Sequence, residues 1–348
     1  MLPKVSVIIL SYNQGKYIRQ ALDGVVSQQT NFPFEVIVAD DCSMDDTLDV
    51  CRDFESKYSF VKVEQSDKNL GYSKNWERAL SLGSGEYLAI FEGDDYWTDN
   101  LKLQKQSNYM DANPDCGMCY TECDIFNEDT KVLQSNIFAN GICVFNSENP
   151  MLSKGYAGNV TWLIRRKTLK SMALTVPDKH PDVPWLLLYE LCLHTKFGFL
   201  PENTGVWRRH KGSFSNEKDA IKMYGYQKDT FLWKKKYIPV FPEPERNTIE
   251  LYTRALLYLW TYANKIGDKI IIDDITDFFN SRINIQKLGN YMINSANRIQ
   301  TLQKDIVGLQ KSLRYRVGTV ILSPLLLIKK IIFRNERANS FNNNSRLQ

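Results

Sequence analysis

The sequence has no uninterrupted apolar run of the roughly 18 residues that a membrane-spanning helix needs. Cysteines are few and odd in number, seven in 348 residues, which does not suit a disulfide framework. A large excess of one charge is also lacking. The net charge of +4, without a cluster of aromatic and arginine residues, argues against a nucleic-acid partner. The first residues lack the three-part pattern of a secretion signal. We therefore expect a protein of the reducing cytoplasm.

The composition, 43% hydrophobic and 24% charged, is typical of a globular chain with one large or two moderate domains. Its first 125 residues alternate between strand and helix patterns. Strands are expected at 5–10, 34–39, 61–64 and 87–91, and helices at 17–26, 43–54 and up to residue 82, the second of them with Ser43 as its N-cap. Repeated strand–helix–strand units predict a parallel sheet with helices on both faces.

Three carboxylates follow the last of these apolar strands: Glu92, Asp94 and Asp95. Carboxylates this close repel one another unless they share a cation. Mg²⁺ takes one or two protein carboxylates and completes its shell with water and phosphate oxygens. The cluster therefore predicts a site for a metal and a diphosphate. An acidic turn that caps the helix beginning near Asp99 is the alternative.

Two further strand ends carry polar residues, Ser11–Tyr12 and Asp40–Asp41. In an open α/β sheet, ligands bind at the carboxyl ends of the strands. We expect all three strand ends to meet at one edge of the sheet.

These segments, in this order and spacing, resemble the inverting family-2 glycosyltransferases of GT-A fold. The matching stretches are 5–13, 35–47, Asn69 and Gly71, Lys74 and Asn75, and 85–95. The resemblance extends over roughly residues 3–215. It implies a GT-A type, Rossmann-like mixed sheet flanked by helices, which we assign to residues 1–215. One departure is Glu92, because the family usually has Asp at this position.

The resemblance also implies roles for individual residues. Donor binding is expected of Ser11, Tyr12, Asp40, Asp41, Lys74, Asp94, Arg208 and Arg209, and metal binding of Glu92, Asp94, Asp95 and His210. In this scheme Tyr12 stacks on the nucleotide base and Asp41 accepts a hydrogen bond from it. Lys74 lies near the diphosphate, or is an ordinary lysine in the first turn of a helix. The cofactor is a divalent metal, Mn²⁺ or Mg²⁺.

The second half of the expected site follows the sheet. Residues 158–166 read as a strand, and 206–215 resemble an aromatic-Arg-x-His loop that closes over the diphosphate. Asp182 matches the acid that opens a helix and serves as the catalytic base. A helix N-terminus keeps such a carboxylate ionised. Because Asp is also a preferred N-cap, a purely structural role for Asp182 stays open.

From about residue 216 the pattern changes to long, aromatic-rich helices, and we assign 216–334 to a helical C-terminal region. Within it, 313–334 joins an apolar stretch to basic residues, which suits an amphipathic helix on an anionic membrane surface. A helix docked on the protein core is the alternative. Residues 293–313 allow a homodimer contact, and the Asn-rich tail 335–348 is expected to be disordered.

Together these features predict a metal-dependent, inverting glycosyltransferase at the cytoplasmic face of the inner membrane. It would move a sugar from a nucleotide-sugar donor to a glycan or lipid-linked acceptor in cell-surface polysaccharide biosynthesis. A nucleotidyltransferase of related fold is the first alternative, although 11–15 lacks the glycine-rich basic loop expected of one. The second is a catalytically inactive scaffold protein that binds nucleotide-sugars.

Overall fold

The computed structural model describes residues 2–141, 143–153, 158–172, 174–178, 182–211 and 220–244, with scattered residues between 246 and 272. The chain divides into two compact units, residues 1–218 with 229–250, and residues 219–228 with 251–348. The expected domain boundary after residue 215 lies outside the described residues, as do the membrane helix 313–334, the dimer contact 293–313 and the tail 335–348. These assignments stay predictions.

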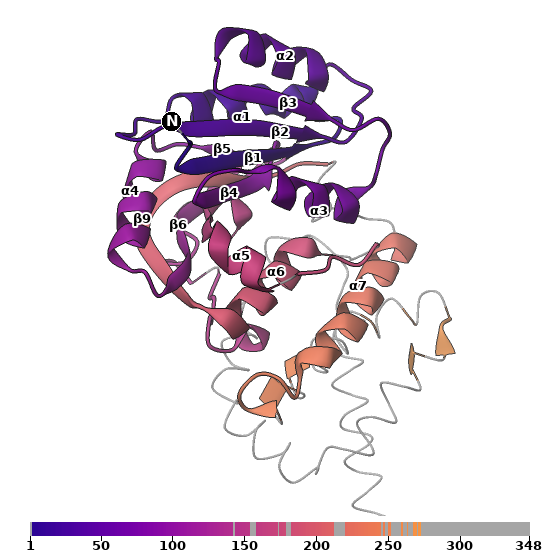
Figure 1. Cartoon of the computed structure of the whole chain (residues 1–348). Coiled ribbons are helices and arrows are strands. Elements are labelled where there is room, and N and C mark those ends of the chain that lie inside the picture. The colour runs from indigo at the N-terminus through magenta and orange to yellow at the C-terminus, as the bar shows by residue number, and fades with distance from the viewer. Residues whose placement is uncertain are drawn as a thin grey trace, which may run out of the picture. The chain divides into compact units, whose positions relative to one another are not determined.

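The first unit is built on one mixed sheet (Figure 1). The strands of the described residues are β1 Val5–Ser11, β2 Phe34–Asp40, β3 Val61–Gln65, β4 Tyr87–Glu92, β5 Tyr96–Trp97, β6 Cys116–Asn127, β7 Val132–Gln134, β8 Leu163–Arg165 and β9 Lys196–Arg209. Their order is β3-β2-β1-β4-β8-β6-β9-β5, with β7 paired to β6. Strands β1 to β4 run parallel, whereas β8 is antiparallel to both of its neighbours. The predicted mixed α/β sheet is confirmed.

The described residues also form helices. They are α1 Gly15–Val26, α2 Thr47–Lys57, α3 Tyr72–Leu82, α4 Lys102–Ala112, α5 Arg166–Met172, α6 Val183–His194 and α7 Ala220–Lys234, with short 3-10 turns η1 Pro150–Leu152, η2 Asn159–Thr161 and η4 Lys235–Tyr237. Among the described residues, none of the helices combines the length and apolar character needed to cross a bilayer.

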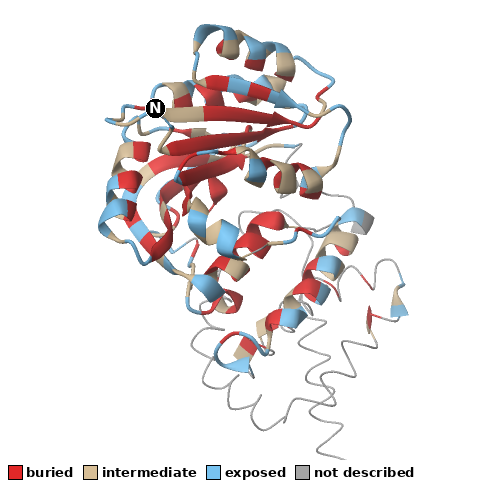
Figure 2. Cartoon of the chain, in the orientation of Figure 1, coloured by how far each residue is buried: buried red, intermediate tan, exposed pale blue. Residues whose placement is uncertain are grey.

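The core explains why β1 is apolar throughout. All seven of its residues are buried, as Figure 2 shows for the centre of the sheet. Val5, Val7 and Ile9 share a core cluster with residues of α1 and α2, while α3 contacts β1 and β2. A strand covered on both faces needs apolar side chains in both directions.

The register brings the polar strand ends together, as the sequence predicted. Ser11 at the end of β1 pairs with Asp40 of β2, and Leu10 pairs with Glu92 of β4. Parallel neighbours end at the same edge of the sheet, so the turns that follow these strands are adjacent.

Three local predictions are wrong. Helix α2 begins at Thr47 and not after an N-cap at Ser43, because the Ser43 hydroxyl donates to Asp40 instead. The expected strand 158–166 is a 3-10 turn followed by the short strand β8. The expected loop 206–215 begins as strand, since β9 stays paired with β6 as far as Arg209.

Candidate active site

The turns after β1 and β2 are locked together by buried hydrogen bonds. Asp40 accepts from the Ser11 hydroxyl at 2.9 Å and from the Ser43 backbone N–H at 2.9 Å. The Ser43 hydroxyl in turn accepts the N–H of Asn13, whose φ of 51° is left-handed. Asn and Asp tolerate this conformation best among residues with a side chain. Ser11 and Asp40 are buried, and their hydrogen bonds thus fix the conformation of the two turns at the sheet edge.

Asp41 performs the same task for the loop before α3. Its carboxylate accepts the backbone N–H groups of Leu70 at 2.7 Å and of Gly71 at 3.0 Å, and only 3% of the residue is exposed. Tyr12, by contrast, is 46% exposed at the same edge. An open aromatic face beside a rigid polar loop is suited to stacking against a nucleotide base.

The side chain of Asp94 contacts a histidine and a glutamine. Its Oδ2 lies 3.0 Å from His210 Nε2, and its Oδ1 accepts from the side-chain amide of Gln14 at 3.3 Å. The His210 ring packs on Tyr17, with ring centroids 4.4 Å apart. The expected partnership of Asp94 with His210 is therefore present, while Gln14 was not anticipated. The only sequence signal for Gln14 is its place in the turn after β1.

Asp95 points into the protein. Its carboxylate accepts the backbone N–H of Arg208 at 2.8 Å, and 4% of the residue is exposed. Burial, together with the charges of Asp94 and Glu92, raises the pKa of Asp95 well above its usual range. Asp95 therefore ties the acidic turn to β9.

Arg208 and Arg209 lie on different faces of β9, because side chains alternate along a strand. The Arg208 guanidinium donates to the backbone carbonyl of Asp94 at 2.8 Å and lies over the rings of Tyr17 and Tyr96. Arg209 instead lies 4.4 Å from the ring centroid of Trp207. Of the two expected donor-binding arginines, the structure brings only Arg208 to the acidic cluster.

Glu92 is held by a residue that the sequence did not indicate. The side-chain amide of Asn159, in η2, donates to Glu92 Oε2. Burial is the main reason that the pKa of Glu92 rises to about 7, and the charges of Asp94 and Asp182 act in the same direction.

The charge of the candidate base, Asp182, contributes to the raised pKa of Glu92. Asp182 is the N-cap of α6, and its carboxylate accepts the N–H of Trp185 at 3.2 Å. The predicted helix opening at Asp182 is therefore confirmed, and its catalytic role stays a proposal.

Lys74 does not contact the acidic cluster. Its ammonium group lies 2.9 Å from the Glu77 carboxylate and 2.7 Å from that of Asp178. Asp178 lies four residues before Asp182, the N-cap of α6. Lys74 thus links α3 to the segment that leads to Asp182, which agrees with its alternative as a helix-turn lysine.

The residues fit a divalent metal in one respect. Within the described part of the chain, no three His, Cys, Asp or Glu side chains converge closely enough to hold an ion by themselves. Mg²⁺ or Mn²⁺ bound with a diphosphate needs only one or two protein ligands. Asp94 with His210 can supply two. Burial is the main cause of the raised pKa values of Glu92 and Asp95, and a cation beside them would relieve the repulsion between carboxylates that adds to it.

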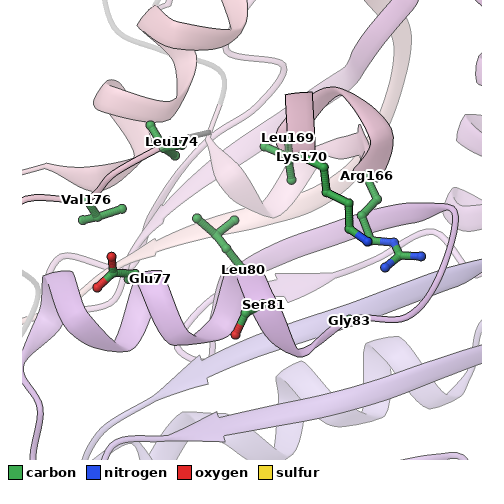
Figure 3. A pocket seen from close by; sticks show the side chains of 9 residues that line it. All are labelled: Glu77, Leu80, Ser81, Gly83, Arg166, Leu169, Lys170, Leu174 and Val176. Atoms are coloured by element: carbon green, nitrogen blue, oxygen red, sulfur yellow. The ribbon is translucent and has the colours of Figure 1, made fainter. Parts of the chain in front are cut away.

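A hollow of about 380 Å³ lies elsewhere, between α3 and α5 (Figure 3). Its apolar lining comes from Leu80, Leu169, Leu174 and Val176, with Arg166 and Lys170 extending side by side near Gly83. None of the expected site residues lines it. The acidic edge of the sheet therefore remains the candidate active site.

Comparisons with known proteins agree with this geometry. Residues 6–172 match the family model for glycosyl transferase family 2. An uncharacterized protein of Mycobacterium tuberculosis is 34% identical over 216 residues, which are 59% of this chain and 59% of that protein. The putative teichuronic acid biosynthesis glycosyltransferase TuaG of Bacillus subtilis is 32% identical over 137 residues, 39% of this chain and 53% of TuaG. The chain thus spans about three-fifths of the length of the first of these relatives.

Two solved structures are similar in fold. A mannosyltransferase of Pyrobaculum calidifontis, in complex with GDP-Man and Mn²⁺, has a TM-score of 0.56 and 16% identity, covering 89% of this chain and 85% of that one. TarS 1–349 of Staphylococcus aureus, in complex with UDP-GlcNAc, has a TM-score of 0.54 and 20% identity, covering 85% and 81%. The family match identifies residues 6–172 as a glycosyl transferase family 2 domain, and the likeness to these two structures, together with the mixed sheet, shows that its fold is GT-A.

Proposed function

We propose that the protein is an inverting glycosyltransferase that moves a sugar from a nucleotide-diphosphate donor to a hydroxyl of a glycan or lipid-linked acceptor. The observation that carries this proposal is the contact of Asp94 with His210, beside Glu92, at the carboxyl edge of the sheet. Such an edge can bind a diphosphate on one side, while the protein would place a general base for the acceptor hydroxyl on the other.

Tyr12 and Asp41 would bind the base of the donor. The exposed ring of Tyr12 would stack on it. Asp41 would accept a hydrogen bond from a ring N–H, since a carboxylate has about four lone-pair sites and Leu70, Gly71 and the Ser66 hydroxyl occupy three of them. Ser11 and Asp40 would support this pocket through their buried bonds.

Asp94 and His210 would hold Mn²⁺ or Mg²⁺, with Glu92 and Asp95 adding negative charge behind them. A bound cation would offset the charge that develops on the leaving diphosphate. Arg208 would fix the acidic turn in place through its bond to the Asp94 carbonyl. Arg209 and Lys74, which the structure engages elsewhere, would contribute to donor binding only indirectly.

Asp182 would act as the general base. The acceptor oxygen would bond to the anomeric carbon while the bond from that carbon to the diphosphate oxygen breaks. The proton of the acceptor hydroxyl would pass to Asp182, and the diphosphate would leave with the electron pair. A single displacement of this kind inverts the anomeric centre.

The relatives support a role in cell-surface polysaccharide synthesis. TuaG is described as a putative teichuronic acid biosynthesis glycosyltransferase and TarS as a poly(ribitol-phosphate) β-N-acetylglucosaminyltransferase. Binding of the segment 313–334 to the cytoplasmic face of the membrane, and a homodimer through 293–313, rest on the sequence alone. Membrane binding would place the enzyme near a lipid-linked acceptor.

The test is a screen of UDP-, GDP- and dTDP-sugars for thermal stabilisation of the protein, with and without Mn²⁺. A ligand that binds only the folded state raises its melting temperature. We expect one donor to stabilise the protein in a Mn²⁺-dependent manner and to be consumed when a glycan acceptor is added. Stabilisation by a nucleoside triphosphate with release of pyrophosphate would favour a nucleotidyltransferase. Binding without turnover of any acceptor would favour an inactive scaffold.

A further inference from the structure

We propose that Asn159 is a positioning residue of the donor site, which orients the Glu92 carboxylate so that it accepts a hydrogen bond from a hydroxyl group of the bound nucleotide-sugar. This inference rests on the proposed function and adds one residue to it. Asn159 lies 67 positions from Glu92 in the sequence, and nothing in the sequence pattern links the two.

The contact itself is specific. Asn159 is buried, with 4% of its surface exposed, and its side-chain nitrogen donates to Oε2 of Glu92. Glu92 remains half-buried, at the end of β4 where the acidic turn begins. A fixed donor on one oxygen therefore sets the direction in which the rest of the carboxylate faces the site.

The turn that carries Asn159 is itself held in place. The Trp97 indole N–H donates to the carbonyl of Val160 at 2.8 Å. Lys102 and Gln106 donate to the carbonyl of Thr161, at 3.2 Å and 2.8 Å. These donors come from β5 and α4, directly after the acidic turn in the sequence. The amide of Asn159 is therefore aimed by a rigid frame and not by a mobile loop.

The chemistry of the pair favours a role in binding. A buried Asn can satisfy its amide with a backbone carbonyl, as Asn75 does with Ala39 at 3.0 Å. Asn159 instead donates to a carboxylate that already feels the charges of Asp94 and Asp182. A Lys or Arg at this position would neutralise Glu92, whereas a neutral amide orients the carboxylate and leaves its charge available.

The first test compares Asn159→Ala with Asn203→Ala. Asn203 is a matched control, because its amide also donates to a carboxylate, that of Asp124 on β6. The dissociation constant of the donor found in the screen is measured by calorimetry with Mn²⁺, and KM and kcat for the same donor are measured separately. We expect Asn159→Ala to weaken donor binding roughly tenfold or more, as for loss of a hydrogen bond to a charged group, with a smaller change in kcat. Asn203→Ala should leave both unchanged.

The second test exchanges the partners, as Glu92→Gln with Asn159→Asp. The pair again joins one amide to one carboxylate, so the melting temperature should return towards that of the wild type. Donor affinity should stay low, because the carboxylate now lies on η2. Recovery of both the melting temperature and the donor affinity in the exchanged pair would show that Asn159 only supports the fold. Equal donor affinities in Asn159→Ala and Asn203→Ala would show the same. If Asn159→Ala does not fold, the exchanged pair carries the test.

A wild-type protein that binds no nucleotide-sugar overturns the proposed function and this inference together, whereas the other outcomes affect Asn159 alone.

Discussion

His210 Nε2 lies 3.0 Å from Asp94 Oδ2, although the two residues are 116 positions apart in the sequence. The contact arises because β5 follows the acidic turn and pairs with β9, with Tyr96 opposite Val206. The end of β9 is thereby brought to the end of β4. One strand pairing thus converts an acidic turn into a site with both a carboxylate and an imidazole.

Replacing Asp94 or Asp95 by Asn separates metal binding from folding. Asp94→Asn should lose the Mn²⁺ dependence of nucleoside-diphosphate binding and keep its stability, because Asp94 is partly exposed. Asp95→Asn keeps an oxygen that accepts the Arg208 N–H. Asp95→Ala removes it and should cost about 1–3 kcal/mol in the free energy of unfolding. Calorimetry with and without Mn²⁺ and denaturant unfolding give the two quantities. Unchanged Mn²⁺ dependence in Asp94→Asn would exclude Asp94 as a ligand.

Asp182→Asn tests the catalytic base. Asn is as good an N-cap as Asp, so α6 should keep its bond to the Trp185 N–H and the protein its stability. The variant cannot accept the proton of the acceptor hydroxyl, and turnover should fall by about 10²–10⁴-fold with donor affinity unchanged. Single-turnover kinetics at saturating donor measure this loss. A variant with reduced melting temperature but normal turnover per folded molecule would identify Asp182 as a cap alone.

Arg208→Lys distinguishes a structural from a phosphate-binding arginine. Lys cannot reproduce the planar guanidinium that bonds to the Asp94 carbonyl and lies between Tyr17 and Tyr96. We expect a loss of about 1–3 kcal/mol in the free energy of unfolding. Arg209→Lys, on the opposite face of β9, is the control; a Lys ammonium can still lie over the Trp207 ring, so the loss of stability should be smaller than for Arg208→Lys. Equal stabilities, with weaker donor binding only in Arg208→Lys, would indicate direct contact with the diphosphate.

The sheet edge could be predicted from the sequence because two strong local signals determine it. Apolar, β-branched runs give the strands, and parallel pairing then places Ser11 beside Asp40. The opening of α6 was equally predictable, since an N-cap such as Asp182 acts within its own helix. The apolar runs and the N-cap are local signals, whereas the parallel pairing follows from the strand–helix–strand order.

The remaining parts of the site depend on tertiary packing. Asn159 acquires its role only because Trp97 and Lys102 hold η2 against β4, and no periodic pattern marks such a residue. The roles of Arg208 and Arg209 could not be predicted from the sequence for the same reason. A basic motif resembling a loop indicates two phosphate ligands, but pairing of β9 with β6 extends the strand and sends Arg208 and Arg209 to opposite faces.

The basic apolar segment 313–334 gives a prediction from sequence alone. Each basic residue near an anionic surface contributes about 1 kcal/mol to binding. Replacing Lys329, Lys330 and Arg334 by Glu should therefore release the full chain from phosphatidylglycerol vesicles almost completely. Co-sedimentation of the variant and the wild type measures this, with phosphatidylcholine vesicles as a control. Equal pelleting of both proteins would indicate that these residues do not face a membrane.

Lys102 should make stability depend on pH. Its ammonium group is fully buried beside Gln106 and the Trp97 ring, and burial lowers its pKa from 10.5 to about 7. Between these two values the unfolded chain binds a proton that the folded chain has released. Proton binding by the unfolded chain therefore favours unfolding less as pH rises, and the free energy of unfolding increases across this window. Below pH 7 both states are protonated, and the cost of burying the charged Lys102 is constant.

Lys102→Met removes this titration. From pH 7 to pH 9 the wild type should gain about 2 kcal/mol in the free energy of unfolding relative to the variant. The loss of the bonds to Gln106 and Thr161 changes the stability of the variant by the same amount at every pH and so does not affect the slope. Lys105→Met, three residues along α4 and more exposed, is the control and should follow the wild-type slope. Urea unfolding at several pH values measures the difference, and parallel curves for Lys102→Met and the wild type would show that Lys102 keeps its proton in the folded protein.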